Sequence, residues 1–105
     1  MLRSDAIHAA RAAAKSCGYA LAVHGSEVRD LDLLAVPWID NPAYDQDGVA
    51  DRIREVLGGK FGMPLVTEKP HGRRAYVIHP KGKRTFGDNW YIDLSVMPRK
   101  EPVDA

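Results

Sequence analysis

Two aspartates separated by one residue stand at the start of an apolar run, in the stretch RDLDLLAV. Side chains on a β-strand alternate between the two faces of a sheet, so Asp30 and Asp32 point to the same side, with Cα atoms roughly 7 Å apart. Leu31, Leu33 and Ala35 point to the other side, where they can be buried. The alternation therefore predicts two carboxylates on the open face of a sheet.

A third aspartate lies in a later segment, WYIDLSV, which has the same alternation. The apolar side of this segment consists of Ile92, Leu94 and Val96. Asp93 lies on the other side, together with Tyr91 and Ser95. If the apolar sides of both strands share one core, Asp93 joins Asp30 and Asp32 on the open face.

Three carboxylates on one face repel one another, which raises their pKa values unless a cation neutralises them. Mg²⁺ prefers oxygen ligands and is commonly held by one or two carboxylates together with substrate phosphates, and Mn²⁺ suits the same ligands. Two such ions can stabilise both the attacking and the leaving oxygen of a phosphoryl displacement. The aspartates thus indicate phosphate chemistry that depends on Mg²⁺ or Mn²⁺. A purely structural alternative stays open, in which Asp30 ends a turn, Asp32 faces solvent and Asp93 pairs with an arginine.

A basic segment extends from residue 69 to residue 84 and contains no Asp or Glu. Its cations are Lys69, Arg73, Arg74, Lys81, Lys83 and Arg84. Arg73, Arg74 or Lys83 could clamp a phosphate, and the guanidinium fork suits bidentate binding. Alternatively, the charges only protect an edge strand from aggregation. His71 lies in a predicted tight turn, Pro-His-Gly, and is expected to be exposed.

Gly25-Ser26, Asp30-Leu31-Asp32 and Asp93 together resemble the motifs of the polymerase-β-type nucleotidyltransferase superfamily. The resemblance implies that Asp30, Asp32 and Asp93 are metal ligands, and that Asp93 also helps to orient or deprotonate the attacking hydroxyl. It implies further that Gly25 and Ser26 contact a phosphate of a nucleoside triphosphate. The implied reaction is attack of an acceptor hydroxyl, on a nucleic acid or a protein, at the α-phosphorus, with pyrophosphate leaving.

A narrower resemblance covers residues 19 to 99. The segments HGSEVRDLDLLAVPW, KPHGRRAYVIH and YIDLSVMPR are similar to those of small phage and prophage nucleotidyltransferase-like proteins. The chain departs from the superfamily in one respect, because only Glu27, Val28 and Arg29 separate the Gly-Ser pair from Asp30. Three residues cannot form the helix whose N-terminal amides help to bind a triphosphate, although Arg29 could supply a charge in its place. The alternative function is therefore an inactive binding or regulatory module for a nucleotide, a nucleic-acid end or a host protein.

The elements that must position these residues can be read from periodicity and from capping residues. Helices are predicted over 4–17 and 48–57, the second with Asp47 as N-cap and with Gly58 and Gly59 at its end. Strands are predicted over 19–24, 30–36, 64–70, 74–80 and 90–96. The first of these is apolar on both faces and is expected to be central. The order predicts an α+β fold, a mixed β-sheet with helices packed on one face, which is the minimal nucleotidyltransferase-like fold that the resemblance implies.

The whole chain is small and nearly neutral, with 105 residues and a formal charge of +1. It fits a single domain over residues 1–98, followed by a flexible tail over 99–105. Neither a signal peptide nor a membrane-spanning apolar run is visible, so we expect a cytoplasmic protein without a membrane partner. Cys17 is the only cysteine and is expected to fill space in the core. The aromatic residues Trp38, Tyr44, Trp90 and Tyr91 are expected mainly at the core or its rim, although each could stack on a base.

Overall fold

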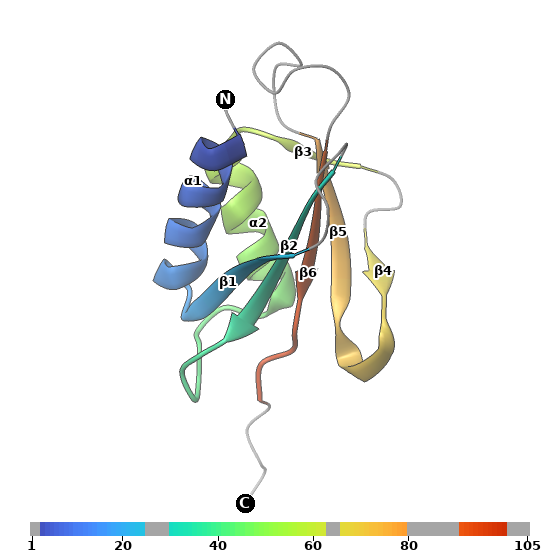
Figure 1. The fold of residues 1–105 in the computed structure, drawn as a ribbon. Coiled ribbons are helices and arrows are strands. Elements are labelled where there is room, and N and C mark those ends of the chain that lie inside the picture. The colour runs from blue at the N-terminus through green and yellow to red at the C-terminus, as the bar shows by residue number, and fades with distance from the viewer. Residues whose placement is uncertain (1–2, 25–29, 63–65, 80–90, 101–105) are drawn as a thin grey trace, which may run out of the picture.

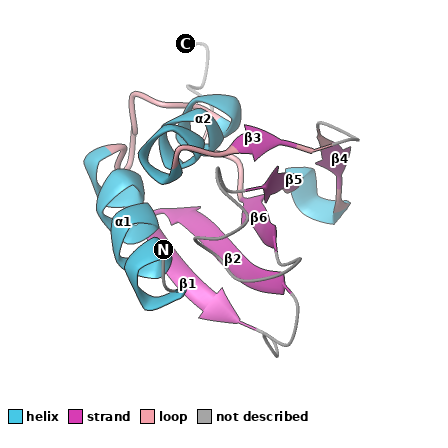
Figure 2. Cartoon of the chain, turned by 90° about the horizontal axis from the view of Figure 1, so that it is seen from above, coloured by secondary structure: helices cyan, strands magenta, loops and turns pink. Residues whose placement is uncertain are grey.

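The computed structural model describes residues 3–24, 30–62, 66–79 and 91–100. In these ranges two helices cover one face of a mixed sheet, which confirms the predicted α+β fold (Figures 1 and 2). The helices are α1 (Arg3–Ser16) and α2 (Gln46–Leu57), and a short 3₁₀ turn, η1, covers Pro70–Gly72. The strands are β1 (Tyr19–His24), β2 (Asp30–Pro37), β3 (Lys60–Phe61), β4 (Thr67–Glu68), β5 (Arg74–His79) and β6 (Tyr91–Val96).

The strands of the described residues are ordered β1-β2-β6-β5-β3, and β4 also pairs with β5. β2 and β6 run parallel, whereas the other described pairs are antiparallel. A parallel pair needs a crossover connection, which here includes α2 and β5. The central strands β2 and β6, which carry the predicted aspartates, therefore lie side by side although they are far apart in the sequence.

The hydrophobic core lies between this sheet and the two helices. β2 contributes Leu31, Leu33 and Ala35, and β6 contributes Ile92, Leu94 and Val96, all of them buried as the alternation predicted. Alanines on α1 are buried as well, namely Ala6, Ala10, Ala13 and Ala14. Because alanine side chains are short, α1 can approach the sheet closely. Within the described part of the chain, this packing leaves the opposite face of β2 and β6 free of helices.

Helix α2 begins two residues earlier than predicted. Asp45, not Asp47, is the N-cap, and its Oδ1 accepts a hydrogen bond of 2.8 Å from the Gly48 amide. Asp47 lies in the first turn, where its carboxylate accepts a hydrogen bond from Tyr76. The predicted C-terminus is confirmed, because Gly58 adopts the left-handed conformation with φ of 64° and caps the helix.

Other details of the predicted elements differ from the structure. β1 is an edge strand rather than a central one, and its alanines Ala20 and Ala22 are exposed. Because alanine is small, it is tolerated on a buried or on an exposed face. A strand with apolar residues on both faces therefore need not be covered on both sides. On α2, Val49, Ile53 and Leu57 are buried, whereas Val56 is 41% exposed. Within the strand predicted over 64–70, only Thr67–Glu68 pairs as β4 in the described part.

At the C-terminal end of the described residues, Arg99 donates hydrogen bonds of 3.1 Å to the carbonyls of Pro42 and Ala43. These bonds hold the chain after β6 against the loop that precedes α2. Cys17 is a free, buried thiol, as expected. Among the described residues, no helix has the length and apolar character needed to cross a membrane.

Candidate functional site

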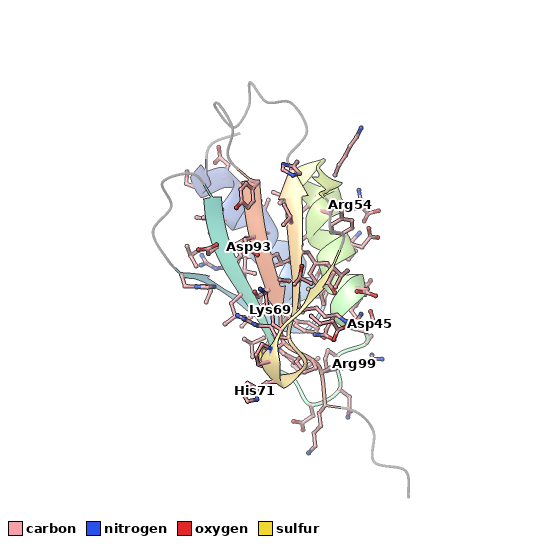
Figure 3. The ribbon with its side chains drawn as sticks, turned by 90° about the vertical axis from the view of Figure 1, so that its right-hand side faces the viewer. Asp45, Arg54, Lys69, His71, Asp93 and Arg99 are labelled. Atoms are coloured by element: carbon pink, nitrogen blue, oxygen red, sulfur yellow. The ribbon has the colours of Figure 1, made fainter. Side chains whose placement is uncertain are left out.

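The candidate site centres on Asp32 of β2 and Asp93 of β6. The two residues are Cα partners in the parallel pair, and neighbouring strands lie about 4.8 Å apart. Their sequence neighbours are buried against the helices, so both half-buried aspartates belong to the open face, where Figure 3 labels Asp93. The structure thus brings together two residues that the alternation predicted on one face. Asp30 pairs with Tyr91 in the same ladder, but its side chain lies outside the described residues.

A histidine extends this row of polar residues across a third strand. His24, at the end of β1, is the Cα partner of Asp32 on the side away from Asp93. It is exposed, and its position alternates with the core-facing Tyr19, Leu21 and Val23. Sequence spacing gave no reason to select His24. The alternation of side chains along β1 predicts which face of the sheet His24 occupies. Its position next to Asp32 follows only from the pairing of β1 with β2.

The donor chemistry of this row fits a hard divalent cation. Two carboxylates side by side on adjacent strands offer oxygen ligands while leaving further positions to water and substrate oxygens. Among the described side chains, no group of three or more His, Cys, Asp and Glu residues is arranged to hold a metal ion. The described part of the site therefore offers the pair Asp32 and Asp93, and Asp30 stays a prediction as the third ligand.

An aromatic pair lies next to the carboxylates on the open face. Tyr91 precedes Asp93 by two residues and therefore shares its face, as predicted. The Tyr91 ring packs against the ring of His79 on β5, with centroids 5.9 Å apart and planes tilted by 50°. The two rings form a shelf of partly exposed aromatic surface beside Asp93.

On the other side of the carboxylates, the open face is hollowed by a cavity of about 260 Å³, which we call the Arg73 pocket. It is lined by Leu34, Pro70, His71, Arg73 and Met97. Leu34 follows Asp32 by two residues on the same face, so the pocket begins next to the carboxylate pair. Its apolar lining and two basic side chains suit a ligand that carries an anionic group.

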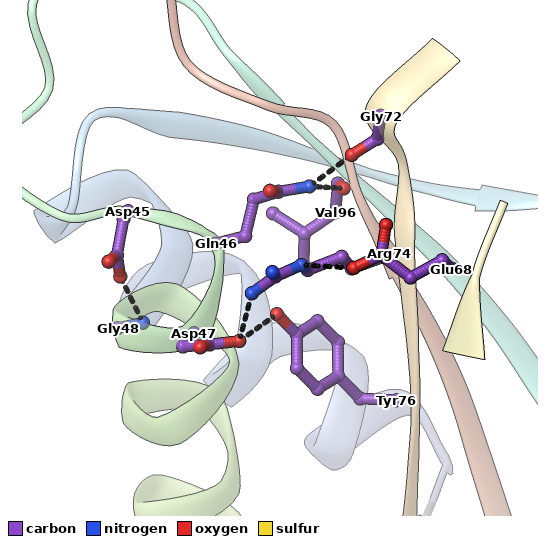
Figure 4. Close-up of polar contacts among 9 residues, drawn as sticks. All are labelled: Asp45, Gln46, Asp47, Gly48, Glu68, Gly72, Arg74, Tyr76 and Val96. Atoms are coloured by element: carbon purple, nitrogen blue, oxygen red, sulfur yellow. Dashed lines mark hydrogen bonds and ion pairs between the residues drawn. The ribbon is translucent and has the colours of Figure 1, made fainter. Parts of the chain in front are cut away.

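The turn that carries His71 is held in a defined position at the edge of the pocket. Gln46, at the start of α2, donates through Nε2 to the carbonyls of Gly72 and Val96, at 2.7 and 2.8 Å. These bonds connect the η1 turn to the end of β6 (Figure 4). His71 itself adopts a left-handed backbone with φ of 65° and is exposed, as predicted. Nothing in the sequence pattern singled out Gln46 for this role.

Arg74 lies on the opposite side of the sheet from its neighbour Arg73. Its guanidinium forms ion pairs with Asp47 at 3.1 Å and with Glu68 at 3.2 Å (Figure 4). The hydrogen bond to Asp47 is the main reason why the pKa of Arg74 is raised. Arg74 therefore links β5 to α2 and β4, away from the carboxylate face, and its predicted contact with a phosphate stays a prediction. Of the two arginines, Arg73 is the one that borders the candidate site.

Several predicted site residues lie outside the described part of the chain. Gly25, Ser26 and Arg29 belong to this group, as do Lys83 and Trp90. Their predicted contacts with phosphates or bases stay predictions. The described site consists of the carboxylate pair, the flanking His24, the aromatic shelf and the Arg73 pocket.

No protein-family model matches the chain, and no curated protein matches its sequence. Among solved structures, the Cid1 poly(U) polymerase, in a crystal structure with MgGTP bound, is similar to the chain with a TM-score of 0.59 at 17% sequence identity. The similarity covers 90% of this chain and 31% of the polymerase chain, so the protein spans less than a third of that length. At 17% sequence identity, this similarity shows a shared fold alone. The two helices and mixed sheet of the chain therefore form an α+β fold that is shared with one part of a poly(U) polymerase.

Proposed function

We propose that the protein is a metal-dependent nucleotidyltransferase, which transfers a nucleoside monophosphate from a nucleoside triphosphate to a hydroxyl acceptor. The observation that carries this proposal is the register of Asp32 and Asp93 on adjacent parallel strands of the open face. The similarity of the fold to a poly(U) polymerase supports it. The acceptor would be a nucleic acid or a protein.

Asp32 and Asp93 would hold Mg²⁺ or Mn²⁺, with Asp30 as the third ligand. Such an ion, when bound, neutralises phosphate charge and favours displacement at phosphorus. Asp93 would orient the acceptor hydroxyl and accept its proton, because a carboxylate beside the reacting oxygen can act as a general base. Arg73 would bind a phosphate at the edge of its pocket, and Gly25, Ser26 and Arg29 would contact the triphosphate.

The short segment between Ser26 and Asp30 favours a second candidate function. It contains three residues, too few for the helix whose N-terminal amides would bind a triphosphate. In this alternative, the fold serves as a catalytically inactive module that binds a nucleotide, a nucleic-acid end or a protein. Such a module would bind its ligand without turnover.

Calorimetric titration tests the proposal. Mg²⁺ or Mn²⁺ is titrated with and without a nonhydrolysable nucleoside triphosphate into wild type, Asp93→Asn and the control Asp5→Asn, which alters an exposed aspartate on α1. We expect metal-dependent nucleotide binding that is lost in Asp93→Asn and unchanged in Asp5→Asn. A second assay follows label from an α-phosphate-labelled triphosphate into RNA, DNA or protein acceptors.

The outcomes separate the two functions. Binding with label transfer that requires Asp93 supports the nucleotidyltransferase. Binding without transfer to any acceptor supports the inactive module. If wild type binds neither metal nor nucleotide, the transferase proposal is overturned.

A further inference from the structure

A second hollow lies at the edge of the sheet, between α1 and the edge strand β1, and we call it the Trp38 cleft. Its volume is about 280 Å³. It is lined by Arg11, Lys15, Tyr19, Ala20, Leu21 and Trp38. Figure 1 shows α1 and β1 side by side, with the end of β2, which leads into Trp38, close to the start of β1.

Trp38 is the most exposed large hydrophobic residue among those described, at 60%. Its backbone is nevertheless fixed, because its amide donates a 3.0 Å hydrogen bond to the carbonyl of Gly18. Tyr19 and Leu21 are buried and form an apolar floor beside it. A large ring held at a hydrophobic hollow is costly to leave in water, and this arrangement is typical of a residue that contacts a ligand.

Two cations lie on the helix side of the Trp38 cleft. Arg11 and Lys15 are four residues apart on α1, so they lie one turn from each other on one face, and both are exposed. The Nε of Arg11 donates a hydrogen bond of 3.4 Å to the Leu21 carbonyl on β1, which keeps the guanidinium at the cleft. Among the described residues that line the cleft, none is acidic. The charge of the cleft therefore complements an anionic ligand that also offers an apolar ring.

We propose that the Trp38 cleft binds single-stranded nucleic acid, with one base stacked on the Trp38 indole and the adjoining phosphates at Arg11 and Lys15. Base stacking on an aromatic side chain combined with a cationic track is the usual way in which proteins hold single strands. The size of the cleft suits one base and its sugar-phosphate, and a base within a duplex is not available for stacking on a side chain.

The cleft is separate from the carboxylate site. Asp32 lies near the start of β2 and Trp38 directly follows its last residue, so the strand separates them by about 20 Å. None of the residues that line the cleft is a predicted metal ligand. Binding at the cleft therefore does not require metal, and it does not depend on the proposed transferase activity.

Fluorescence anisotropy with a fluorescein-labelled oligo(dT) of ten nucleotides, in low salt with EDTA, tests this proposal. We expect Trp38→Ala to weaken binding at least tenfold, whereas Trp38→Phe, which keeps a ring, retains most of the affinity. Lys15→Gln should reduce the slope of log K against log salt by about 0.7, because one phosphate contact is lost. Arg52→Gln, which removes an exposed cation on α2, should leave both affinity and slope unchanged.

Further measurements separate the possible reasons for failure. Circular dichroism checks that the Trp38 variants are folded, and Trp38→Leu, which keeps apolar bulk without a ring, should weaken binding as Trp38→Ala does. Because the assay contains EDTA, a metal ion at the carboxylate site does not contribute to the binding that is measured. The proposal is overturned if wild type does not bind oligo(dT), or if Trp38→Ala binds as well as wild type. It is also overturned if a Glu-Tyr copolymer binds more tightly through the same residues, since the cleft would then be a site for acidic peptides.

Discussion

Asp32 and Asp93 are in-register neighbours on the parallel strands β2 and β6, and both belong to the face that the helices leave open. Like charges directly opposite each other on a sheet are destabilising. A divalent cation between them would remove this repulsion and, by binding the native state alone, would raise its stability. We therefore expect millimolar Mg²⁺ or Mn²⁺ to raise the melting temperature of wild type but not of Asp93→Asn. Thermal unfolding followed by circular dichroism, with and without metal, measures both responses.

The same melting curves contain two internal controls. Asp5→Asn should respond to the metal like wild type. In metal-free buffer, Asp93→Asn should be at least as stable as wild type, since it removes one of two adjacent charges. An equal response to metal in Asp93→Asn and wild type would mean that the ion binds elsewhere.

The sequence predicted the faces of the central strands because a strand has a strict period of two. Leu33 and Leu94 are buried, whereas Asp32 and Asp93 lie on the other face, as the alternation required. Gly58 likewise marked the end of α2, because few residues other than glycine tolerate a positive φ. These features depend on local geometry, which a short stretch of sequence encodes.

Features that depend on strand order could not be predicted in the same way. The position of His24 next to Asp32 requires β1 to pair with β2, and β1 proved to be an edge strand. Arg73 and Arg74 are adjacent residues of the same type, but Arg73 lines the pocket, whereas Arg74 pairs with Asp47 and Glu68 on the other side of the sheet. Asp45 and Asp47 are both suitable N-cap residues, and the structure has Asp45 in this role. Asp47 instead accepts hydrogen bonds from Tyr76 and Arg74, which are distant in the sequence.

The Tyr76 hydroxyl donates a hydrogen bond of 2.6 Å to Asp47 Oδ1, and this bond connects β5 to the first turn of α2 (Figure 4). Because the Tyr76 ring is buried, Tyr76→Phe keeps the packing and removes only the hydroxyl. We expect this change to lower the free energy of unfolding by about 1 kcal/mol. Urea denaturation at neutral pH measures it. Tyr44→Phe, at a position 39% exposed, serves as the control and should change stability by less than about 0.5 kcal/mol. Equal effects in the two variants would argue against a role for the Asp47 contact.

The ionisation of Tyr76 should make the free energy of unfolding depend on pH in the alkaline range. Burial, and then the hydrogen bond to Asp47, raise the pKa of Tyr76 in the folded chain. In the unfolded chain the phenol loses its proton near pH 10. Above this pH the unfolded state therefore binds fewer protons than the native state, so the free energy of unfolding falls as the pH rises. Below this pH both states keep the proton, and Tyr76 makes no contribution to the pH dependence of stability. Urea denaturation between about pH 8 and pH 11 should show a smaller loss in Tyr76→Phe than in wild type. Parallel losses in the two proteins would contradict this assignment.

Gly58 offers a test of how the end of α2 contributes to stability. Its φ is 64°, its amide donates a hydrogen bond of 3.0 Å to the Glu55 carbonyl, and the Gly59 amide donates one of 3.1 Å to Arg54. A side chain with a Cβ is strained at this φ, so Gly58→Ala should lower the free energy of unfolding by about 1 kcal/mol. Gly58→Asn should lower it less, because asparagine tolerates the left-handed conformation. Chemical denaturation of both variants measures the difference. If alanine were no worse than asparagine, the helix end would have to rearrange in the variants, and the left-handed cap would not be a source of stability.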